Sequence, residues 1–248
     1  MSAARIDLSG RVALVTGASR GIGSAIARAL AAAGAAVGVN YRERATAAAA
    51  VVAAIERNGG RARACGADVT QAGEVSTLVS ELQRLLGPID ILVNNAGVAS
   101  LRAPEQLDEA EFDHLIAGNL KSTFLCMQAV LPGMRARRWG RIVNLSSAAA
   151  RSGGLVSPLY NAAKAGVEGL TRGYATRVAR EGVTVNAVAP GPIDTEMAAP
   201  LKQHDIAARI PVGRLGTSDE IAEAVLLVLG NAFITGQTIA VNGGILLA

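Results

Sequence analysis

Two side chains that can move a proton lie four positions apart, at Tyr160 and Lys164. On a helix this spacing places both on one face. A phenol has an ordinary pKa of about 10 and is a weak acid at neutral pH, but a neighbouring cation stabilises the phenolate and lowers that pKa. Such a pair can exchange a proton with a carbonyl or a secondary alcohol near neutral pH. The same spacing also occurs in ordinary pairs on a helix surface.

A hydroxyl group, that of Ser147, lies thirteen residues before Tyr160. It directly follows a predicted strand that ends in Val143-Asn144-Leu145-Ser146. Doubly wound sheets bind their ligands outside the carboxyl ends of the strands, so Ser147 is expected at such a site.

A glycine-rich turn follows the first predicted strand and precedes a predicted helix. It reads Thr16-Gly17-Ala18-Ser19-Arg20-Gly21-Ile22-Gly23. Gly17 permits a tight turn, Gly21 lets the backbone approach a pyrophosphate, and Gly23 lets the helix pack close to the sheet. The helix N-terminus then turns its free N–H groups and positive dipole end toward phosphates. This arrangement predicts a dinucleotide site, with a plain structural turn as the alternative.

The second predicted strand ends in Asn40-Tyr41-Arg42, where NAD-binding domains usually carry an acidic residue for the ribose 2′-hydroxyl. An arginine cannot accept a hydrogen bond from that hydroxyl, but it can clamp a 2′-phosphate with two donors. Arg20, within the glycine-rich turn, is a second candidate for the same phosphate. The end of the second strand therefore favours NADP(H) over NAD(H), unless Arg20 and Arg42 are solvated surface residues.

Short apolar runs alternate with longer helical patterns along the chain. The predicted strands are Val12–Thr16, Ala36–Tyr41, Arg61–Cys65, Ile89–Val93, Arg141–Leu145, Val183–Ala189 and Thr238–Val241, and the predicted helices lie near 22–33, 44–58, 71–86, 108–136, 158–180 and 218–229. The first six runs are mostly continuous, which indicates strands covered on both faces. We therefore expect an α/β fold: a Rossmann-type doubly wound parallel sheet of about seven strands with helices on both faces. Residues 1–248 are expected to form a single domain, with a substrate lid at about 193–211.

Composition narrows the class of protein further. Half of the 248 residues are hydrophobic and 18% are charged, which excludes a disordered chain. The net charge is +4, but only three Phe, three Tyr and one Trp are present, too few for a single-stranded nucleic-acid binder. Two isolated cysteines indicate neither a metal site nor a disulfide framework. Without a long apolar run or a targeting segment, we expect a cytoplasmic protein with no membrane contact.

The chain resembles the short-chain dehydrogenase/reductases over essentially its whole length. The matching motifs are Thr16 to Gly23, Asp68-Val69, Asn94 to Gly97, Asn119, Ser147, Tyr160-x-x-x-Lys164 and Pro190-Gly191. The resemblance implies that Tyr160 is the catalytic acid/base and that Lys164 lowers its pKa and bonds the nicotinamide ribose. It also implies that Ser147, rather than its neighbour Ser146, holds the substrate oxygen. Asn119 would anchor a water that passes protons to Lys164.

The resemblance also implies which residues bind the cofactor. Asp68 and Val69 would contact the adenine, Asn95 the adenosine ribose region, and Ile193 and Thr195 the nicotinamide amide. The complete expected NADP(H) site comprises Gly17, Ser19, Arg20, Gly21, Ile22, Gly23, Tyr41, Arg42, Asp68, Val69, Asn95, Ala96, Gly97, Tyr160, Lys164, Pro190, Gly191, Ile193 and Thr195, without a metal.

Within the family, the chain looks most like the 3-oxoacyl-acyl-carrier-protein reductases, which act in fatty acid biosynthesis. Arg138 stands where carrier-dependent relatives have a basic docking residue, but the other such position carries Glu181, beside Arg180. Basic residues near the mouth of the active site would attract an acidic carrier protein. A small free ketone, a sugar or a quinone is the alternative substrate, and a non-catalytic NADP-binding sensor is the alternative function.

The C-terminal region and the basic run before the fifth strand bear on assembly. The resemblance implies a homotetramer, although the stretch 225–233 is about four residues shorter than in relatives. The basic run at 134–141 ends a predicted helix, where cations complement the helix dipole. Alternatively, the run docks an acidic partner or a phosphate-bearing arm of the substrate.

Overall fold

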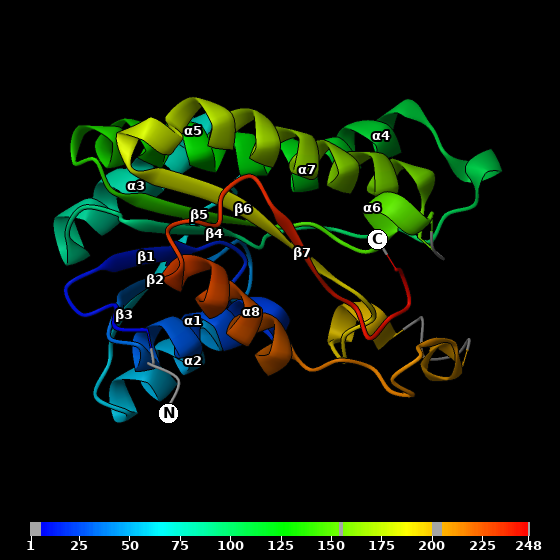
Figure 1. The fold of residues 1–248 in the computed structure, drawn as a ribbon, viewed down its shortest axis with the longest axis horizontal. Coiled ribbons are helices and arrows are strands. Elements are labelled where there is room, and N and C mark those ends of the chain that lie inside the picture. The colour runs from blue at the N-terminus through cyan, green and yellow to red at the C-terminus, as the bar shows by residue number, and fades with distance from the viewer. Residues whose placement is uncertain (1–5, 154–155, 200–204, 248) are drawn as a thin grey trace.

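The computed structural model describes residues 6–153, 156–199 and 205–247. Its centre is a parallel sheet of seven strands in the order β3-β2-β1-β4-β5-β6-β7 (Figure 1). The strands are β1 (Val12–Val15), β2 (Ala36–Tyr41), β3 (Arg61–Gly66), β4 (Ile91–Asn94), β5 (Gly140–Leu145), β6 (Val183–Pro190) and β7 (Thr238–Val241). This order reverses direction between β1 and β4, so the expected doubly wound sheet in a single domain is confirmed.

Helices cover both faces of the sheet in three layers (Figure 1). One face carries α1 (Gly21–Ala32), α2 (Ala45–Arg57) and α8 (Ser218–Gly230); the other carries α3 (Ala72–Leu86), α4 (Glu109–Ile116), α5 (Ser122–Ala136) and α7 (Pro158–Val178). The short α6 (Ala149–Ser152) follows β5. Each layer buries a separate apolar core: Val15 packs with Ile26 on the first face, and Leu14 packs with Leu82 on the second. Neighbouring residues of β1 thus pack on opposite faces of the sheet. Because both faces are covered by helices, every residue of the strand is apolar.

Two sequence-based expectations differ from the structure. The run Arg61–Cys65 is not continuously buried, because β3 is an edge strand whose Arg61 and Arg63 are exposed. The predicted helix at 108–136 is divided into α4, a π-helical turn at Ala117–Lys121 and α5. A single periodic pattern runs through all three, so the division was not visible in the sequence.

The segment after β6 is irregular, as expected, and contains a short 3-10 turn at Ile206–Arg209. Ile193 forms an isolated parallel bridge with Gly216, which ties the start of the segment to its end. Residues 200–204 of the expected lid at 193–211 lie outside the described residues. Within the described part of the chain, no helix is both long and apolar enough to cross a membrane.

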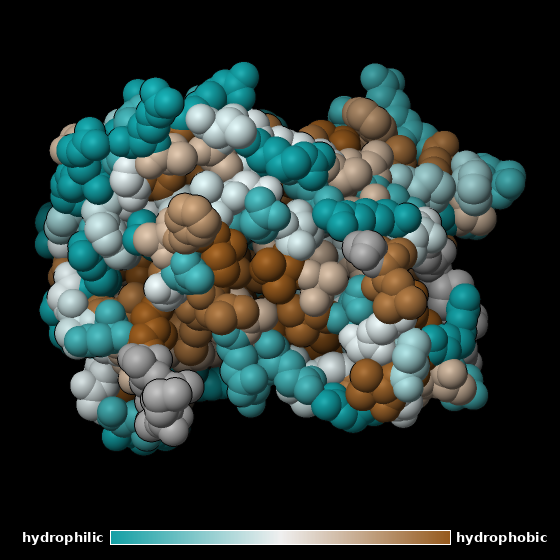
Figure 2. Space-filling view, viewed as in Figure 1, coloured by the Kyte–Doolittle hydropathy of each residue, from teal (hydrophilic) through white to brown (hydrophobic). Residues whose placement is uncertain are grey.

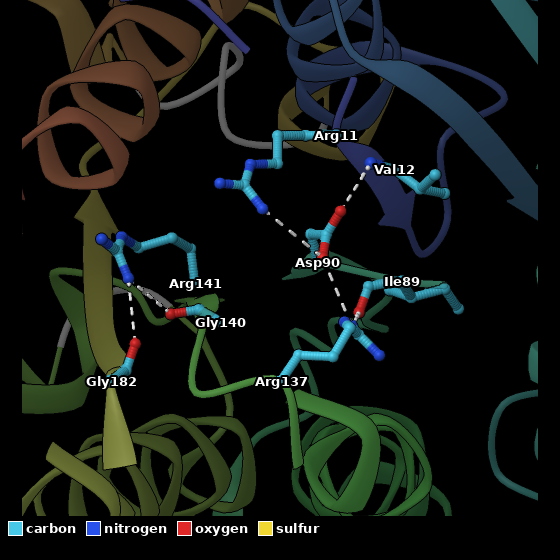
Figure 3. A network of polar contacts seen from close by, with 8 residues as sticks. All are labelled: Arg11, Val12, Ile89, Asp90, Arg137, Gly140, Arg141 and Gly182. Carbon is cyan, nitrogen blue, oxygen red and sulfur yellow. Dashed lines mark hydrogen bonds and ion pairs between the residues drawn. The ribbon is translucent and has the colours of Figure 1, made fainter. Parts of the chain in front are cut away.

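Arginines surround one carboxylate at the amino edge of the sheet (Figure 3). Asp90, just before β4, accepts from the backbone N–H of Val12 at 3.2 Å and pairs with Arg137 at 3.3 Å and Arg11 at 3.9 Å. Because the strands are parallel, this edge is opposite the edge at which Ser147 follows β5. A strand of six residues spans about 20 Å, so the two edges are well separated.

Candidate active site

One cavity of about 460 Å³ lies at the carboxyl edge of the sheet. All of the catalytic and cofactor-binding residues predicted from the sequence line this cavity. They come from the ends of β1 to β6 and from the segments that follow those strands. The structure therefore brings together residues that are as much as 178 positions apart, from Gly17 to Thr195.

The first turns of α7 hold Tyr160 and Lys164. This helix begins where the Ser157 hydroxyl caps the N–H of Leu159 and Pro158 occupies the first helical position. Lys164 is 5% exposed, and its ammonium donates to the carbonyl of Leu145 at 2.8 Å. Burial lowers the pKa of Lys164 to about 8.

Burial, Ser147 and Lys164 define the surroundings of the Tyr160 phenol. Burial raises the pKa of Tyr160, and a hydrogen bond with Ser147 opposes this shift. Nζ of Lys164 is 5.7 Å from the centroid of the Tyr160 ring. In the protein alone the phenol therefore keeps its proton at neutral pH, and a lowering of its pKa by Lys164 stays a prediction.

The hydroxyls of Ser146 and Ser147 have different partners. Ser147 is hydrogen-bonded with Tyr160, and its Oγ also accepts from the N–H of Ala149 at 3.2 Å. The Ser146 Oγ is buried and instead lies 3.2 Å from Oε1 of Glu168 and 3.3 Å from the carbonyl of Lys164. This geometry supports Ser147 as the residue that faces the substrate.

Asn119 is fully buried in the π-helical turn between α4 and α5. Its Nδ2 donates to the carbonyls of Val98 and Leu115, both at 2.9 Å, and its Oδ1 accepts from the N–H of Val98 at 3.3 Å. Asn119 thus fixes the segment after β4 to the helix. Short π-helical turns are frequent at functional sites. Both polar groups of this side chain have protein partners, and its expected role in holding a water stays a prediction.

The glycine-rich turn is tied to the end of β4. Thr16 Oγ1 accepts from the N–H groups of Asn95 and Ala96, both at 3.0 Å. A Cβ at Gly17 would lie 2.9 Å from Cα of Ala96, and one at Gly23 would lie 2.5 Å from Nδ2 of Asn95. These two positions therefore require glycine because of close packing.

Two features of this turn fit a dinucleotide pyrophosphate. Gly21 has a φ of +52°, which glycine adopts readily, and it leaves the backbone open toward the cavity. The N-terminus of α1 has neither a capping side chain nor an acidic residue in its first turn. Its N–H groups are therefore available to a phosphate.

The far end of the cavity is rich in arginines. Arg42 pairs with its neighbour Glu43 at 2.6 Å, whereas Arg20 and Arg44 both pair with Oε2 of Glu196, at 2.6 and 2.9 Å. All five side chains line the cavity. Arg44, Glu43 and Glu196 were not predicted, although Arg44 and Glu43 adjoin the predicted Arg42 and Glu196 follows the predicted Thr195. Guanidinium groups beside the end of β2 fit a nucleotide that carries a 2′-phosphate.

Arg138 does not lie near the mouth of this cavity, contrary to the sequence-based expectation. It precedes β5 at the amino edge of the sheet, and its Nη2 donates to the carbonyl of Arg180 at 3.0 Å. Glu181 forms an ion pair with Arg135, whose Nη2 is 2.9 Å from Oε1. The predicted strand Arg141–Leu145 already implied this placement, because in a parallel sheet a residue before a strand lies at the edge opposite to Ser147, which follows it.

Comparison with known proteins agrees with this geometry. Residues 11–206 match the short chain dehydrogenase family. A 3-oxoacyl-[acyl-carrier-protein] reductase from Synechocystis sp. is 44% identical over 243 residues, which cover 97% of this chain and 98% of the relative.

Two solved structures share the fold. A dehydrogenase/reductase from Sinorhizobium meliloti 1021 has a TM-score of 0.91 at 38% identity and covers 98% of both chains. A blue fluorescent protein from a metagenomic library, in complex with NADPH, has a TM-score of 0.91 at 36% identity, with 97% of this chain and 100% of that chain covered. With the cavity and its residues, these similarities show that the chain belongs to the short-chain dehydrogenase family and is an NAD(P)-dependent oxidoreductase.

Proposed function

We propose that the protein reduces a carbonyl to a secondary alcohol with NADPH. The observation that carries this proposal is the joint placement of Tyr160, Ser147 and Lys164 on the wall of a cavity that also contains the glycine-rich turn. When bound, the reduced nicotinamide supplies a hydride to the carbonyl carbon. Tyr160 donates its phenolic proton to the carbonyl oxygen, which the Ser147 hydroxyl holds in place.

The state of Tyr160 suits this role. Because burial raises its pKa, the phenol carries its proton at neutral pH and is ready to donate it. Lys164, close behind the ring, stabilises the phenolate that remains after the transfer. Asn119 keeps the segment after β4 against the helix, so the wall of the cavity stays in place beside Lys164.

NADP(H) is favoured over NAD(H) by charge at the end of β2. No acidic side chain stands at Tyr41 or Arg42 to accept from a ribose 2′-hydroxyl, while Arg20, Arg42 and Arg44 line this end of the cavity. A charge-assisted contact between a guanidinium and a phosphate is geometrically specific. The NADPH complex of a structural neighbour supports the same choice.

A 3-oxoacyl thioester delivered by an acyl carrier protein is the proposed substrate. The activity for which the Synechocystis relative is named supports it. The distance between Arg138 and the cavity, together with the pairing of Glu181 with Arg135, favours the alternative of a small ketone that needs no carrier.

A substrate panel with NADPH distinguishes these functions. Acetoacetyl-carrier protein, acetoacetyl-CoA, cyclic ketones, sugars and quinones would be compared by kcat/KM. If the carrier is used, its thioester should be reduced far faster than the CoA thioester, and that advantage should decrease as salt rises. Equal rates with both thioesters would favour a free ketone, and no turnover of any carbonyl would favour a sensor.

We propose a homotetramer as the assembly. Apolar side chains gather over α8 and β7 (Figure 2), where Leu227 is 60% and Phe233 is 98% exposed. Exposed aromatic and aliphatic groups of this kind often mark an interface between subunits. Light scattering at micromolar concentration tests the proposal: a monomer would contradict it, and a dimer would indicate that the shortened segment 225–233 has removed one interface.

A further inference from the structure

One carboxylate of the cavity wall lies where a cofactor phosphate would be attracted. Oε2 of Glu196 is 2.6 Å from Nη1 of Arg20 and 2.9 Å from Nη1 of Arg44. These arginines are the N-cap residues of α1 and α2, and neither is placed near Glu196 by the sequence. All three side chains line the cavity.

The position of Arg44 decides which phosphate is concerned. Arg44 follows β2 by three residues, and the end of that strand is where doubly wound folds contact the 2′ position of the adenosine ribose. Arg20 reaches the same carboxylate from the glycine-rich turn. Thus a single oxygen atom of Glu196 binds two of the three guanidinium groups, those of Arg20, Arg42 and Arg44, that line this end of the cavity.

Charge balance at this end of the cavity makes the carboxylate consequential. The cations Arg20, Arg42 and Arg44 face the anions Glu43, Asp68 and Glu196, so these six side chains have no net charge. A 2′-phosphate adds close to two negative charges. It must therefore either take guanidinium donors away from Glu196 or lie beside that carboxylate unscreened.

We propose that Glu196 is a specificity-determining residue that competes with the 2′-phosphate of NADP(H) for Arg20 and Arg44 and so weakens the preference for NADP(H) over NAD(H). The proposal rests on the proposed NADP(H) dependence. A dinucleotide without the 2′-phosphate leaves both ion pairs intact, and its affinity is therefore independent of Glu196. The side chain of Glu196 is 62% exposed, so the effect is moderate and decreases as salt screens it.

Two small ligands test this without turnover. Calorimetry would compare 2′,5′-ADP with 5′-AMP, which differ only in the 2′-phosphate, on the wild type and on Glu196→Gln. Removing the carboxylate charge should tighten 2′,5′-ADP roughly three- to tenfold and leave 5′-AMP unchanged. Glu223→Gln on α8 makes the same change of net charge away from the cavity and should alter neither ligand.

A second background isolates the arginines. In a variant with both Arg20→Ala and Arg44→Ala, the further change Glu196→Gln should no longer tighten 2′,5′-ADP. If Glu196→Gln weakens 2′,5′-ADP, leaves it unchanged, or tightens both ligands equally, the proposal is wrong. If the wild type itself binds the two ligands equally, the NADP(H) preference fails first and this proposal fails with it; if the wild type discriminates, only the role of Glu196 is at stake.

Discussion

The two ends of the cavity are built on different physics. At the catalytic end, Asn119 is 0% and Lys164 is 5% exposed, and their partners are mainly backbone carbonyls and N–H groups. At the adenosine end, the side chains of Arg44 and Glu196 are 50% and 62% exposed, and their partners are other charged side chains. At the first end, burial shifts the pKa values of the side chains. At the second end, ion pairs between exposed side chains determine how much charge is left for a ligand.

The two ends of the cavity are expected to control different properties of the enzyme. Desolvation shifts the pKa values of Tyr160 and Lys164, and those shifts are screened little by salt. Exposed ion pairs contribute about 1 kcal/mol or less each, and they are easily exchanged for a ligand phosphate. We therefore expect the chemistry to depend on the buried end and the choice of cofactor on the exposed end.

The largest expected effect is at the buried end. Tyr160→Phe removes the proton donor but keeps the ring, so kcat should fall by about 10²- to 10⁴-fold while the Kd for NADPH stays nearly unchanged. Steady-state kinetics and cofactor titration would measure both. Tyr174→Phe, on the same helix but outside the cavity, is the matched control. A Tyr160→Phe enzyme with more than about a tenth of the wild-type rate would exclude the proposed role.

A smaller effect is expected at the exposed end. Arg42→Ala removes a guanidinium whose side chain is 51% exposed, so NADPH should bind about tenfold more weakly and NADH almost unchanged. Fluorescence titration of both cofactors measures this, with Arg57→Ala in the last turn of α2 as the control. Equal losses for both cofactors would contradict a contact between Arg42 and the 2′-phosphate.

The pH dependence should separate the ends further. Lys164 loses its proton above its pKa of about 8, so kcat/KM for NADPH should fall above that pH, at most tenfold per pH unit. In the unfolded chain the same side chain keeps its proton up to the ordinary lysine pKa of 10.5, so Lys164 also makes the free energy of unfolding rise between pH about 8 and 10.5. Lys164→Arg keeps a cation and should abolish the fall near pH 8. A wild-type profile that is flat to pH 10 would count against the shifted pKa.

The smallest effect concerns salt. Raising NaCl from about 50 to about 500 mM shortens the screening length severalfold and should weaken NADPH a fewfold more than NADH, since only NADPH meets the exposed arginines through a 2′-phosphate. The value of kcat at saturating cofactor should stay nearly constant, because Asn119 and Lys164 are buried and Tyr160 is half-buried. If kcat depends on the salt concentration as strongly as the affinity for NADPH does, the proposed difference between the two ends is wrong.

The spacing of residues that are close in the sequence was enough to predict the glycine-rich turn, the pairing of Tyr160 with Lys164 and the type of sheet. Gly17, Gly21 and Gly23 predicted the glycine-rich turn, because each permits a backbone geometry that a turn between an adjacent strand and helix requires. Tyr160 and Lys164 share a helix face wherever that helix lies, so their pairing needed no knowledge of the fold. Alternating apolar strands and amphipathic helices predicted the doubly wound sheet, whose two covered faces the structure confirms.

Only the tertiary structure decided contacts between distant segments. Glu196 meets Arg20 across 176 positions and Arg44 across 152, a meeting that depends on how the segment after β6 folds back over the cavity. The π-helical turn at Asn119 arises where that side chain binds Val98 on another segment, so helical periodicity could not reveal it. The periodicity of a helix or strand indicates on which face of that element a side chain lies. Packing between segments that are distant in the sequence determines which charged groups that side chain contacts.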